Sequence, residues 1–520
     1  MEWMLNGRMR KRLRELFAGK VFLVGGGPGD WTLLTLRAAT LLGAADVVVY
    51  DHLLDPRALE FAADDAELIY AGKRAGKHAL AQSEINELLV KLAREGRMVV
   101  RLKGGDPWIF GRGAEEAEFL AEHGIPFEIV PGVSALTAVP AAAGIPVTHR
   151  RFASALTAAT GHEDPTKEER QLDYRALAGI PGSLVVFMGV RNLRAICSEL
   201  MEGGRDGDES AALVKEGYTT RQKTLTAPLS ELAERAEAEG MSPPALFIVS
   251  PAVGLRERLA WFEDRPLWNR RIVVTRPKEQ AAELVALLEY LGAEVILAPT
   301  IEVVPPADYA DVDEAIRGLD DCALLVFTSV NGVKFFMGRM FELGFDARCL
   351  HGVEVAAVGE ATAGELRRFG IICEHMPRRF TSARLAEHLA GVPRRGKALL
   401  VRSPLAPKAL EDALAAAGFD VVRLEAYRVE SVPLSDEVIE ELRKGVDWLT
   451  FASGSAVRSF VASLSADVVA ALKRGARVLS IGPETSKVIR SVGFGVDCEA
   501  EVHTSWGMVR ALLDHIGRGS

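Results

Sequence analysis

Cysteines are few in this 520-residue sequence, and their placement argues against two ways of stabilising a protein. The five of them are scattered, odd in number and without C-x-x-C spacing. Such a pattern is typical neither of a disulfide framework nor of a structural zinc site, and it favours the reducing environment of the cytoplasm. We therefore expect a cytoplasmic protein that binds no metal.

Long apolar segments and an excess of positive charge are also absent. Hydrophobic residues make up 48% of the chain, but no run approaches the about 20 apolar residues of a membrane-spanning helix. The net charge of −9 argues against bulk binding of nucleic acid. The basic residues 1–18 lack the apolar segment of a signal peptide, so we interpret them as a solvated N-terminal extension, with a weak interfacial helix as the alternative.

Glycines gather where two predicted strands end. The apolar run Val99–Leu102 stops at the sequence GGDP, residues 104–107, and a helical stretch follows. Upstream, VFLVGGGPGD at Val21–Asp30 is typical of a strand that breaks into three glycines. Neither turn has the spacing of a P-loop or of a dinucleotide fingerprint. Because open α/β sheets bind ligands beyond the carboxyl ends of their strands, both turns are candidate ligand contacts, with an ordinary strand–turn–helix connection as the alternative.

Two polar residues in the same half also follow predicted strands. The runs Val47–Tyr50 and Leu68–Ala71 are typical of strands in a parallel sheet built from βαβ units. Asp51 comes directly after the first run, and Lys73 follows the second. A carboxylate at this end of a strand lies on the ligand side of the sheet. The alternatives are a helix or turn cap for Asp51 and plain surface charge for Lys73.

Seven motifs, in order, resemble those of the tetrapyrrole methylase family, and most closely those of uroporphyrinogen-III C-methyltransferase. They are VGGGPGD (24–30), VVVYDHLLDP (47–56), AGKRAGKH (71–78), RLKGGDPWIFGRGAEE (101–116), PGVSA (131–135), PVTHR (146–150) and VVFMGV (185–190). The resemblance covers roughly residues 19–259. It implies a two-lobed α/β methylase fold that binds S-adenosyl-L-methionine and transfers methyl groups to pyrrole carbons of a tetrapyrrole.

The resemblance also implies roles for individual residues. The positions that match Asp51 and Lys73 are assigned in the family as proton acceptor and proton donor. The positions implied to contact the cofactor are Pro28, Gly104, Gly105, Asp106, Ile109, Ser134, Ala135, Met188 and Gly217. Filling of the core is an equally good interpretation of Met188. The candidates for binding the carboxylates of a tetrapyrrole are arginines, with structural ion pairs as the alternative for one or two of them: Arg112, Arg150 and Arg151.

The second half of the chain contains an internal repeat of four blocks. Blocks that begin at residues 271, 293, 325 and 355 recur in the same order at residues 397, 419, 449 and 478. LVFTSVNGVKFF at Leu325, for example, resembles LTFASGSAVRSF at Leu449. With only two copies and a long period, a solenoid is excluded. The repeat predicts two similar α/β lobes that face each other across a cleft.

Each repeat places small polar residues where a predicted strand runs into a helix. Backbone N–H groups and hydroxyls at the start of a helix bind anions, although N-capping alone explains any single turn. Four such turns in two lobes indicate a ligand with many negative charges. The candidate contacts are Thr328, Ser329, Thr362, Ser453, Ser455 and Thr485.

This half resembles the uroporphyrinogen-III synthase family over roughly residues 270–513. The motifs are TRP (275–277), FTSVNGV (327–333), LEAYRV (424–429), FASGSAV (451–457) and IGPETS (481–486). The resemblance implies a two-lobed fold with an interlobe cleft and two linker strands, Ile301–Val304 and Tyr427–Val429. Tyr427 matches a tyrosine proposed to assist the departure of a hydroxyl group, with packing at the cleft as the alternative. The sequence after Arg402 departs from the expected glycine-rich motif, which leaves a substrate contact of Arg402 unassigned.

Together these observations predict a bifunctional enzyme with four segments. Residues 1–18 are the extension, 19–260 the methyltransferase, 261–269 a linker and 270–516 the synthase. The synthase would cyclise hydroxymethylbilane to uroporphyrinogen III, which the methyltransferase would methylate twice to precorrin-2. The alternatives are a later corrin precursor as acceptor, or a second half that only binds ligands. We expect tetrapyrrole substrates, neither nucleic acid nor membrane as partner, and leave open a homodimer through the methyltransferase and the pathway served, siroheme or cobalamin.

Overall fold

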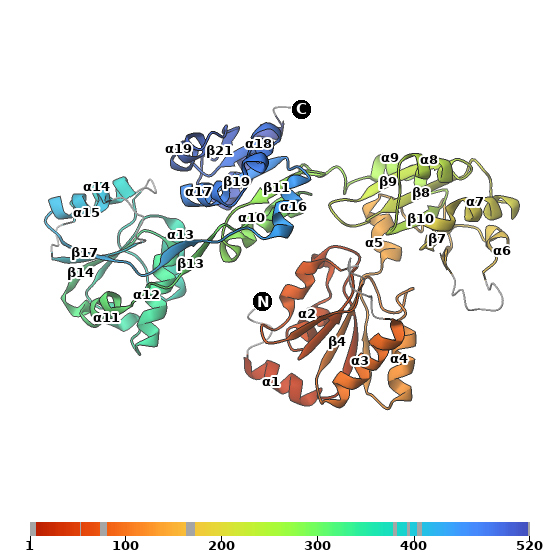
Figure 1. The fold of residues 1–520 in the computed structure, drawn as a ribbon, viewed down its shortest axis with the longest axis horizontal. Helices are drawn as coiled ribbons and strands as arrows, with labels where there is room; N and C mark the ends of the chain where they lie inside the picture. Colours follow the sequence, from red (N-terminus) through yellow and green to blue (C-terminus); the bar gives the residue numbers. More distant parts are fainter. Residues whose placement is uncertain are drawn as a thin grey trace. The chain divides into compact units, whose positions relative to one another are not determined.

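The computed structural model describes residues 7–52, 54–72, 81–162, 172–377, 382–392, 396–402 and 408–517. The chain divides into two compact units (Figure 1). The first comprises Met1–Arg270 with Glu289–Glu294, and the second comprises Arg271–Leu288 with Val295–Ser520. Both are α/β structures, as predicted; the first contains two five-stranded sheets, and the second a five-stranded, a four-stranded and a two-stranded sheet.

The first sheet of the first unit is parallel and has the strand order β3-β2-β4-β1-β5. Its strands are β1 (Val21–Gly25), β2 (Val47–Tyr50), β3 (Glu67–Tyr70), β4 (Val99–Lys103) and β5 (Phe127–Val130). One face packs against α3 (Gln82–Arg94) and α4 (Gly113–Glu122), and the other packs against α2 (Leu36–Leu42) (Figure 1). Because both faces are covered, β1 and β2 are continuous apolar runs rather than alternating ones.

Residues 7–17 are ordered against this sheet. Gly7–Leu16 form α1, and Leu13 and Phe17 pack on the core that contains α2. Arg14 donates hydrogen bonds to the carbonyl oxygens of Ala44 at 2.9 Å and Ala45 at 2.8 Å. The described part of the predicted extension therefore contacts the domain through one face, while Arg8, Lys11 and Arg12 are exposed.

The second sheet of this unit is mixed. Its strand order is β6-β7-β10-β8-β9, in which β6 and β7 run parallel to each other and the other neighbouring pairs are antiparallel. The strands are β6 (Leu156–Thr160), β7 (Ser183–Phe187), β8 (Ser210–Lys215), β9 (Lys223–Pro228) and β10 (Ala245–Val249). One face packs against α6 (Tyr174–Ala178), α7 (Leu193–Glu202) and α8 (Leu232–Ala238). The other packs against α5 (Ala135–Ala142), the helix that leads out of the first sheet.

The second unit consists mainly of two lobes, which we call the terminal lobe (residues 271–288, 295–298 and 433–517, continued by 289–294 of the first unit) and the inserted lobe (306–424). The terminal lobe has the strand order β12-β11-β19-β20-β21, and the inserted lobe has the order β15-β14-β16-β17. The terminal strands are β11 (Arg271–Val274), β12 (Glu294–Leu297), β19 (Trp448–Phe451), β20 (Arg477–Ser480) and β21 (Cys498–Glu499). The inserted strands are β14 (Cys322–Phe327), β15 (Glu354–Ala357), β16 (Lys397–Val401) and β17 (Asp420–Leu424).

Helices follow most of these strands. The terminal lobe contains α10 (Lys278–Tyr290), α16 (Asp436–Arg443), α17 (Gly454–Ala462), α18 (Ala466–Gly475), α19 (Pro483–Ser491) and α20 (Ser505–Gly517). The inserted lobe contains α11 (Ala310–Arg317), α12 (Val330–Glu342), α13 (Glu360–Arg368), α14 (Ser382–Ala390) and α15 (Ala409–Ala416).

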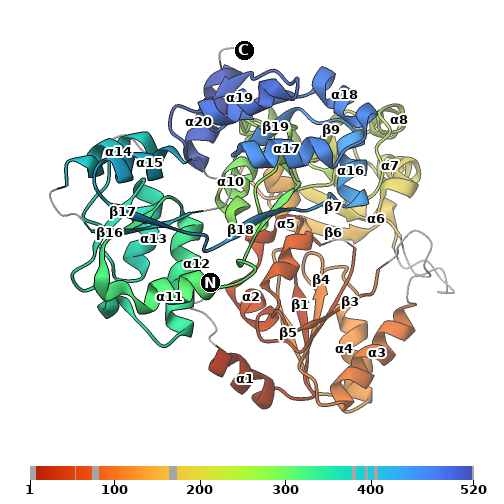
Figure 2. The same cartoon turned by 60° about the vertical axis from the view of Figure 1, so that its left-hand side comes forward.

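The repeated sequence blocks occupy the same places in the two lobes. The strand order β12-β11-β19-β20 in the terminal lobe corresponds, strand by strand, to the order β17-β16-β14-β15 in the inserted lobe. The chain leaves the terminal lobe through β13 (Ile301–Val304) and returns through β18 (Arg428–Ser431), a path that Figure 2 shows. These two strands pair antiparallel, with Val304 opposite Arg428. The two predicted linker strands are thus confirmed, with Tyr427 lying directly before the second.

Candidate functional site

The loops that follow β1, β4 and β5 meet through glycine backbones. A Cβ atom added to Gly132 would lie 2.3 Å from the carbonyl oxygen of Gly105 and 2.7 Å from the Cα of Gly25. Gly105 N donates to Gly27 O at 2.6 Å, and Gly27 N donates to Gly105 O at 3.2 Å. Because only glycine permits so close an approach, the sequence breaks into glycines at these strand ends.

Asp106 and Ser134 hold these loops in place. The Asp106 carboxylate accepts hydrogen bonds from the backbone N–H of Trp108 at 2.8 Å and of Gly132 at 3.0 Å. Ser134 is the N-cap of α5, where its hydroxyl accepts from Leu136 N at 3.2 Å. Five of the predicted cofactor contacts thus lie together at the ends of β4 and β5: Gly104, Gly105, Asp106, Ser134 and Ala135.

The turn between β8 and β9 reaches the same region from the second sheet. A Cβ at Gly217 would lie 2.3 Å from Cγ1 of Val139 on α5. A Cβ at Gly29, the residue after Pro28, would lie 3.3 Å from Gly217 O. The predicted contacts Pro28 and Gly217, far apart in the sequence, therefore belong to two turns that lie against each other.

Phe110 brings the loop after β4 to the end of β7. Its ring packs on that of Phe187 with the centroids 4.8 Å apart, and Met188 follows directly. Met188 has a φ of 55° and is 51% exposed, so the alternative that it fills the core is wrong. Ile109, in the same loop as Phe110, is exposed as well. Apolar side chains from both sheets are thus accessible beside the glycine loops, which is typical of a ligand site.

Asp51 does not cap a helix. Asp55 is the N-cap of the helical turn at Pro56–Phe61. Asp51 Oδ2 instead accepts a hydrogen bond from Arg101 Nη2 at 3.3 Å. Since β2 and β4 are neighbours, this carboxylate lies at the edge of the sheet that carries the glycine loops. Lys73, its predicted partner, lies outside the described residues.

The three predicted arginines differ in their surroundings. Arg112, at the N-cap position of α4, forms an ion pair with Glu115 at 2.5 Å, so the structural alternative applies to it at least in part. Arg150 and Arg151 are exposed on the turn between residues 149 and 153. The Arg151 guanidinium lies over the ring of Phe152, 5.5 Å from its centroid.

Three buried charged residues beneath Asp51 were not predicted as site residues: Arg101, Lys103 and Glu116. The signal was present, because Arg101 and Lys103 interrupt an otherwise apolar strand at every second position and therefore share one face of the sheet. Their partner Glu116 comes from a helix, and no local pattern relates it to them.

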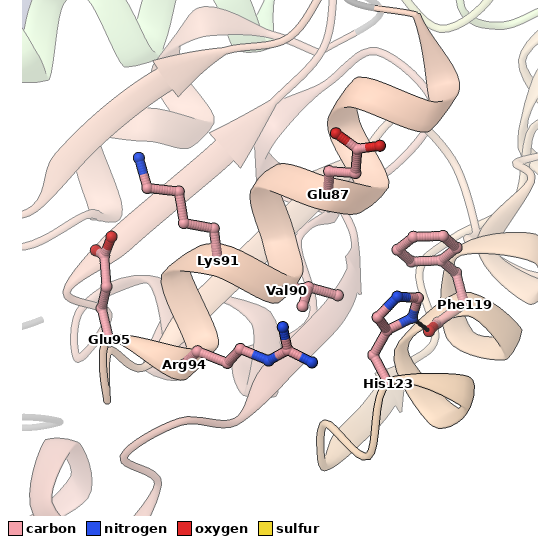
Figure 3. Close-up of a pocket in the computed structure, with 7 residues that line it drawn as sticks. All are labelled: Glu87, Val90, Lys91, Arg94, Glu95, Phe119 and His123. Atoms are coloured by element: carbon pink, nitrogen blue, oxygen red, sulfur yellow. Dashed lines mark hydrogen bonds between the residues drawn. The ribbon is translucent and has the colours of Figure 1, made fainter.

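A shallow groove between α3 and α4 contains none of the predicted residues (Figure 3). Acidic and basic side chains both line it, and His123 Nδ1 lies 2.8 Å from Phe119 O. Among the described residues, no cluster of three or more His, Cys, Asp or Glu side chains could hold a metal ion. No described helix has the length and apolarity that crossing a membrane requires.

In the second unit, Tyr427 lies at the point where the returning linker leaves the inserted lobe, between β17 and β18. It is 6% exposed, its hydroxyl lies 2.9 Å from Ser329 Oγ, and its ring is stacked on Phe335. Burial raises the pKa of Tyr427 above its usual value, while the Ser329 hydrogen bond and the Arg402 charge act in the opposite direction. The phenol therefore keeps its proton at neutral pH. Arg402 itself is buried and pairs with Glu411 at 3.3 Å.

Ser329 and Ser453 occupy equivalent positions in the two lobes. Each is an N-cap with nearly the same φ, −158° and −160°, and each accepts from the backbone N–H three residues later, Gly332 and Ala456. Ser455 Oγ lies 3.0 Å from Ser453 Oγ. Thr328 Oγ1 donates weakly to Val401 O at 3.5 Å. The capping alternative thus accounts for one hydrogen bond of each serine, and no described side chain caps the other amides of these helix starts.

Thr362 and Thr485 lie differently from the serines. Both side chains are buried inside the first turns of α13 and α19. These helices begin after Gly359 and Gly482, which cap without a side-chain hydrogen bond. Any anion at these two turns would therefore meet backbone N–H groups rather than the threonine hydroxyls.

Comparisons with known proteins cover both halves. The family model described as Tetrapyrrole (Corrin/Porphyrin) Methylases matches residues 20–233, and that described as Uroporphyrinogen-III synthase HemD matches residues 282–510. The porphyrin biosynthesis protein HemD of Ruminiclostridium josui is 35% identical over 507 residues, which are 96% of this chain and 99% of that protein.

The chain belongs to the family of fused tetrapyrrole methylases and uroporphyrinogen-III synthases. The predicted fusion is confirmed, and the chain is a bifunctional enzyme of tetrapyrrole biosynthesis, with a uroporphyrinogen-III methyltransferase and a uroporphyrinogen-III synthase.

Two further relatives resemble only the methylase half of this fused enzyme. The S-adenosyl-L-methionine-dependent uroporphyrinogen III methyltransferase of Methanosarcina barkeri is 49% identical over 46% of this chain and 94% of its own. The siroheme synthase of Azotobacter vinelandii is 50% identical over 48% of this chain and 53% of its own. The match thus covers about half the length of that siroheme synthase.

We predict that Gly132→Ala weakens the binding of S-adenosyl-L-methionine by about tenfold or more, because the new Cβ must push the loops after β1 and β4 apart, at about 1–3 kcal/mol. Titration calorimetry on the purified variant measures this affinity. Gly254→Ala is the matched control, since a Cβ there meets no atom within 4 Å. Equal affinities in the two variants would show that the glycine contact is dispensable for binding.

We predict that Tyr427→Phe slows ring closure by roughly tenfold but still yields uroporphyrinogen III above the spontaneous isomer I, since it removes one hydrogen bond worth about 0.5–1.5 kcal/mol. The III:I product ratio measures this. Because the pKa of Tyr427 is raised, the wild-type rate should not fall through tyrosine ionisation below about pH 10.

Ser453→Leu should lower the III:I ratio more than Tyr427→Phe, because leucine also covers the N–H groups at the start of α17. Ser435→Leu removes a comparable N-cap from α16 and serves as the control. If Ser453→Leu and Ser435→Leu give the same III:I ratio while Tyr427→Phe makes isomer I alone, then Tyr427, and not the N–H groups at the helix starts, controls ring closure.

Proposed function

We propose that this enzyme cyclises hydroxymethylbilane to uroporphyrinogen III and then transfers two methyl groups from S-adenosyl-L-methionine to it, giving precorrin-2. Residues 270–516 carry the first reaction and residues 19–260 the second, with 261–269 between them. The observation that carries the methylase part is the meeting of the glycine turns after β1, β4 and β5 with Met188 and Gly217 from the second sheet.

The residues around these turns fit S-adenosyl-L-methionine. The glycines leave room that any Cβ would fill, so backbone N–H and C=O groups can approach a ligand closely. Asp106 holds the turn and retains acceptor capacity for hydroxyl or ammonium groups. The half-exposed Met188 and Ile109 offer apolar contacts to an adenine ring. When bound, the cofactor supplies a methyl group on a good leaving group, so the protein mainly aligns the reactants and excludes water.

Proton transfer and substrate binding fall to other side chains. Asp51, at the end of β2, accepts the proton that the pyrrole ring must lose, and Lys73 donates one. Arg150 and Arg151 are exposed beside Phe152 and bind carboxylates of the macrocycle as bidentate partners. Arg112 contributes from the start of α4, where it exchanges its pair with Glu115 for the substrate.

In the synthase, the protein holds a flexible tetrapyrrole in the shape that closes the ring. The N–H groups at the starts of α12, α13, α17 and α19 bind its carboxylates, two helices from each lobe. The protonated phenol of Tyr427 donates to the departing hydroxyl group, and Ser329 orients that phenol. Because uroporphyrinogen oxidises readily, joining both enzymes in one chain shortens the time that the shared intermediate spends free. The free cysteines support a reducing, cytoplasmic setting for this chemistry.

The test is to supply hydroxymethylbilane with and without S-adenosyl-L-methionine and to identify the products by mass and isomer. The proposal expects uroporphyrinogen III alone without the cofactor, and a product heavier by two methyl groups with it. Isomer I alone would mean that the second half only binds ligands. Methylation of a later corrin precursor, but not of uroporphyrinogen III, would identify the first half as a different methylase.

We predict that Asp51→Asn and Lys73→Ala each slow methylation by about 10²–10⁴-fold, the usual contribution of general acid–base catalysis, while ring closure in the same chain stays unchanged. Asp173→Asn is the control for the carboxylate, because Asp173 caps α6 and asparagine caps equally well. Methylation at the wild-type rate in either of the first two variants would remove that residue from the mechanism.

A further inference from the structure

Four charged side chains form a cluster between β2, β4 and α4, which we call the Arg101 cluster: Asp51, Arg101, Lys103 and Glu116. Arg101 is 3% exposed, Lys103 4% and Glu116 0%. Only Asp51 reaches solvent, with 27% of its side chain exposed. The cluster thus runs from the interior of the sheet to the edge where the glycine loops lie.

Two regularities of the sequence bring these charges together: the alternation of side chains along β4 and the helical spacing of buried residues on α4. Val99, Arg101 and Lys103 point to the α3–α4 face of β4, because side chains alternate along a strand, and Val99 belongs to the core on that face. On α4, Glu116 lies on the same buried stripe as Ala117 and Leu120. The carboxylate of Glu116 therefore meets the two cations inside the domain.

Glu116 anchors the cluster. Its Oε1 accepts from Lys103 Nζ at 2.7 Å, from Gln82 Nε2 at 3.0 Å and from Arg101 Nε at 3.3 Å. Arg101 Nη1 donates to the carbonyl oxygens of Val49 at 3.5 Å and Leu102 at 3.3 Å. The guanidinium is therefore fixed on two sides, and its remaining nitrogen, Nη2, is the one that contacts Asp51 Oδ2.

Stability alone does not account for the cluster. Burying charges costs several kcal/mol each, and well-packed apolar residues in place of a buried ion pair are often as stable or more so. The burial of Lys103 has a visible cost, because desolvation and the neighbouring Arg101 lower its pKa. The second oxygen of Asp51, Oδ1, is buried and accepts no hydrogen bond within the described residues. Glu116 Oε2 is in the same state, but Asp51 is the member of the cluster that lies at the edge of the sheet carrying the glycine loops.

We propose that Arg101 is a positioning residue for methyl transfer: it holds Asp51 by Oδ2 and so fixes the orientation of the carboxylate at the edge of the sheet that carries the glycine loops, and Glu116 and Lys103 fix Arg101. This inference rests on the proposed role of Asp51 as proton acceptor. A carboxylate on two rotatable bonds at the end of a strand has several orientations, and the guanidinium selects one. A misplacement of about 1 Å in a reacting group can cost about a hundredfold in rate.

The test compares Arg101→Met with Arg205→Met in the full-length enzyme. Arg205 is a second buried arginine of the methylase half; it pairs with Glu209 at 2.6 Å and bonds the carbonyl oxygens of Ile180 and Gly182, away from Asp51. Arg101→Met should lower kcat of methylation about ten- to hundredfold, with the KM for S-adenosyl-L-methionine within about twofold of wild type. Arg205→Met should lower the melting temperature but leave kcat unchanged.

Further variants keep the inference falsifiable. Arg101→Lys retains the charge but can reach only one of the two carboxylates, so it should recover part of the lost kcat. If Arg101→Met does not fold, Glu116→Gln removes the anchor with little change of shape and should lower kcat in the same way. Binding of S-adenosyl-L-methionine by each variant, measured by titration calorimetry, reports the folded fraction of the methylase half. A kcat loss for Arg101→Met no larger than that for Arg205→Met overturns the inference.

A double-mutant cycle with Asp51→Asn separates this inference from the proposed function. If Arg101 acts through Asp51, then Arg101→Met causes no further loss in the Asp51→Asn background. An equal further loss there would show that Arg101 acts independently and would overturn the inference alone. Wild-type methylation by Asp51→Asn would instead overturn the proposed role of Asp51, and the inference with it.

Discussion

Contact between glycine backbones is the constraint on which the methylase half depends. Gly25, Gly105 and Gly132 lie so close that a single Cβ would separate their loops. This contact joins the carboxyl ends of β1, β4 and β5, and the loop after β4 then reaches β7 through Phe110. Asp106 and Ser134 lock the arrangement with hydrogen bonds to backbone N–H groups. The proposed ligand site is therefore built mostly from backbone, and the side chains proposed to act on the substrate surround it.

The synthase half is organised by repetition rather than by glycine contacts. Its two lobes repeat one strand order, and the equivalent serines Ser329 and Ser453 cap helices with the same geometry. The repeat supplies helix starts in pairs, whereas Tyr427 exists only once, because it lies where the linker returns. Paired helix starts, proposed as anion contacts, and a single tyrosine, proposed as proton donor, fit the proposed substrate, which has many similar carboxylates and one departing hydroxyl group.

Much of this arrangement could be predicted from the sequence, because the strands, the glycine turns and the repeat are local patterns. Asp51 follows β2, and Ile301–Val304 forms a linker strand, as predicted. What escaped prediction depends on contacts between distant elements. Glu116 meets Arg101 only because α4 packs on β4, and the exposure of Met188 follows from a positive φ after β7. The burial of the Thr362 and Thr485 hydroxyls likewise follows from helix packing, which a polar residue at a helix start does not reveal.

The crossing of the chain between the two synthase lobes sets an order of assembly. β11 pairs with β19, so Ile272 must wait for Trp448 to be synthesised, whereas the inserted lobe is complete at Leu424. On the ribosome, the inserted lobe can fold while β11 still presents unpaired backbone groups, which other chains can pair with. The fused methylase domain precedes both and is already translated by then. In the second half of this enzyme, the inserted lobe can therefore be complete before the terminal lobe that flanks it in the sequence.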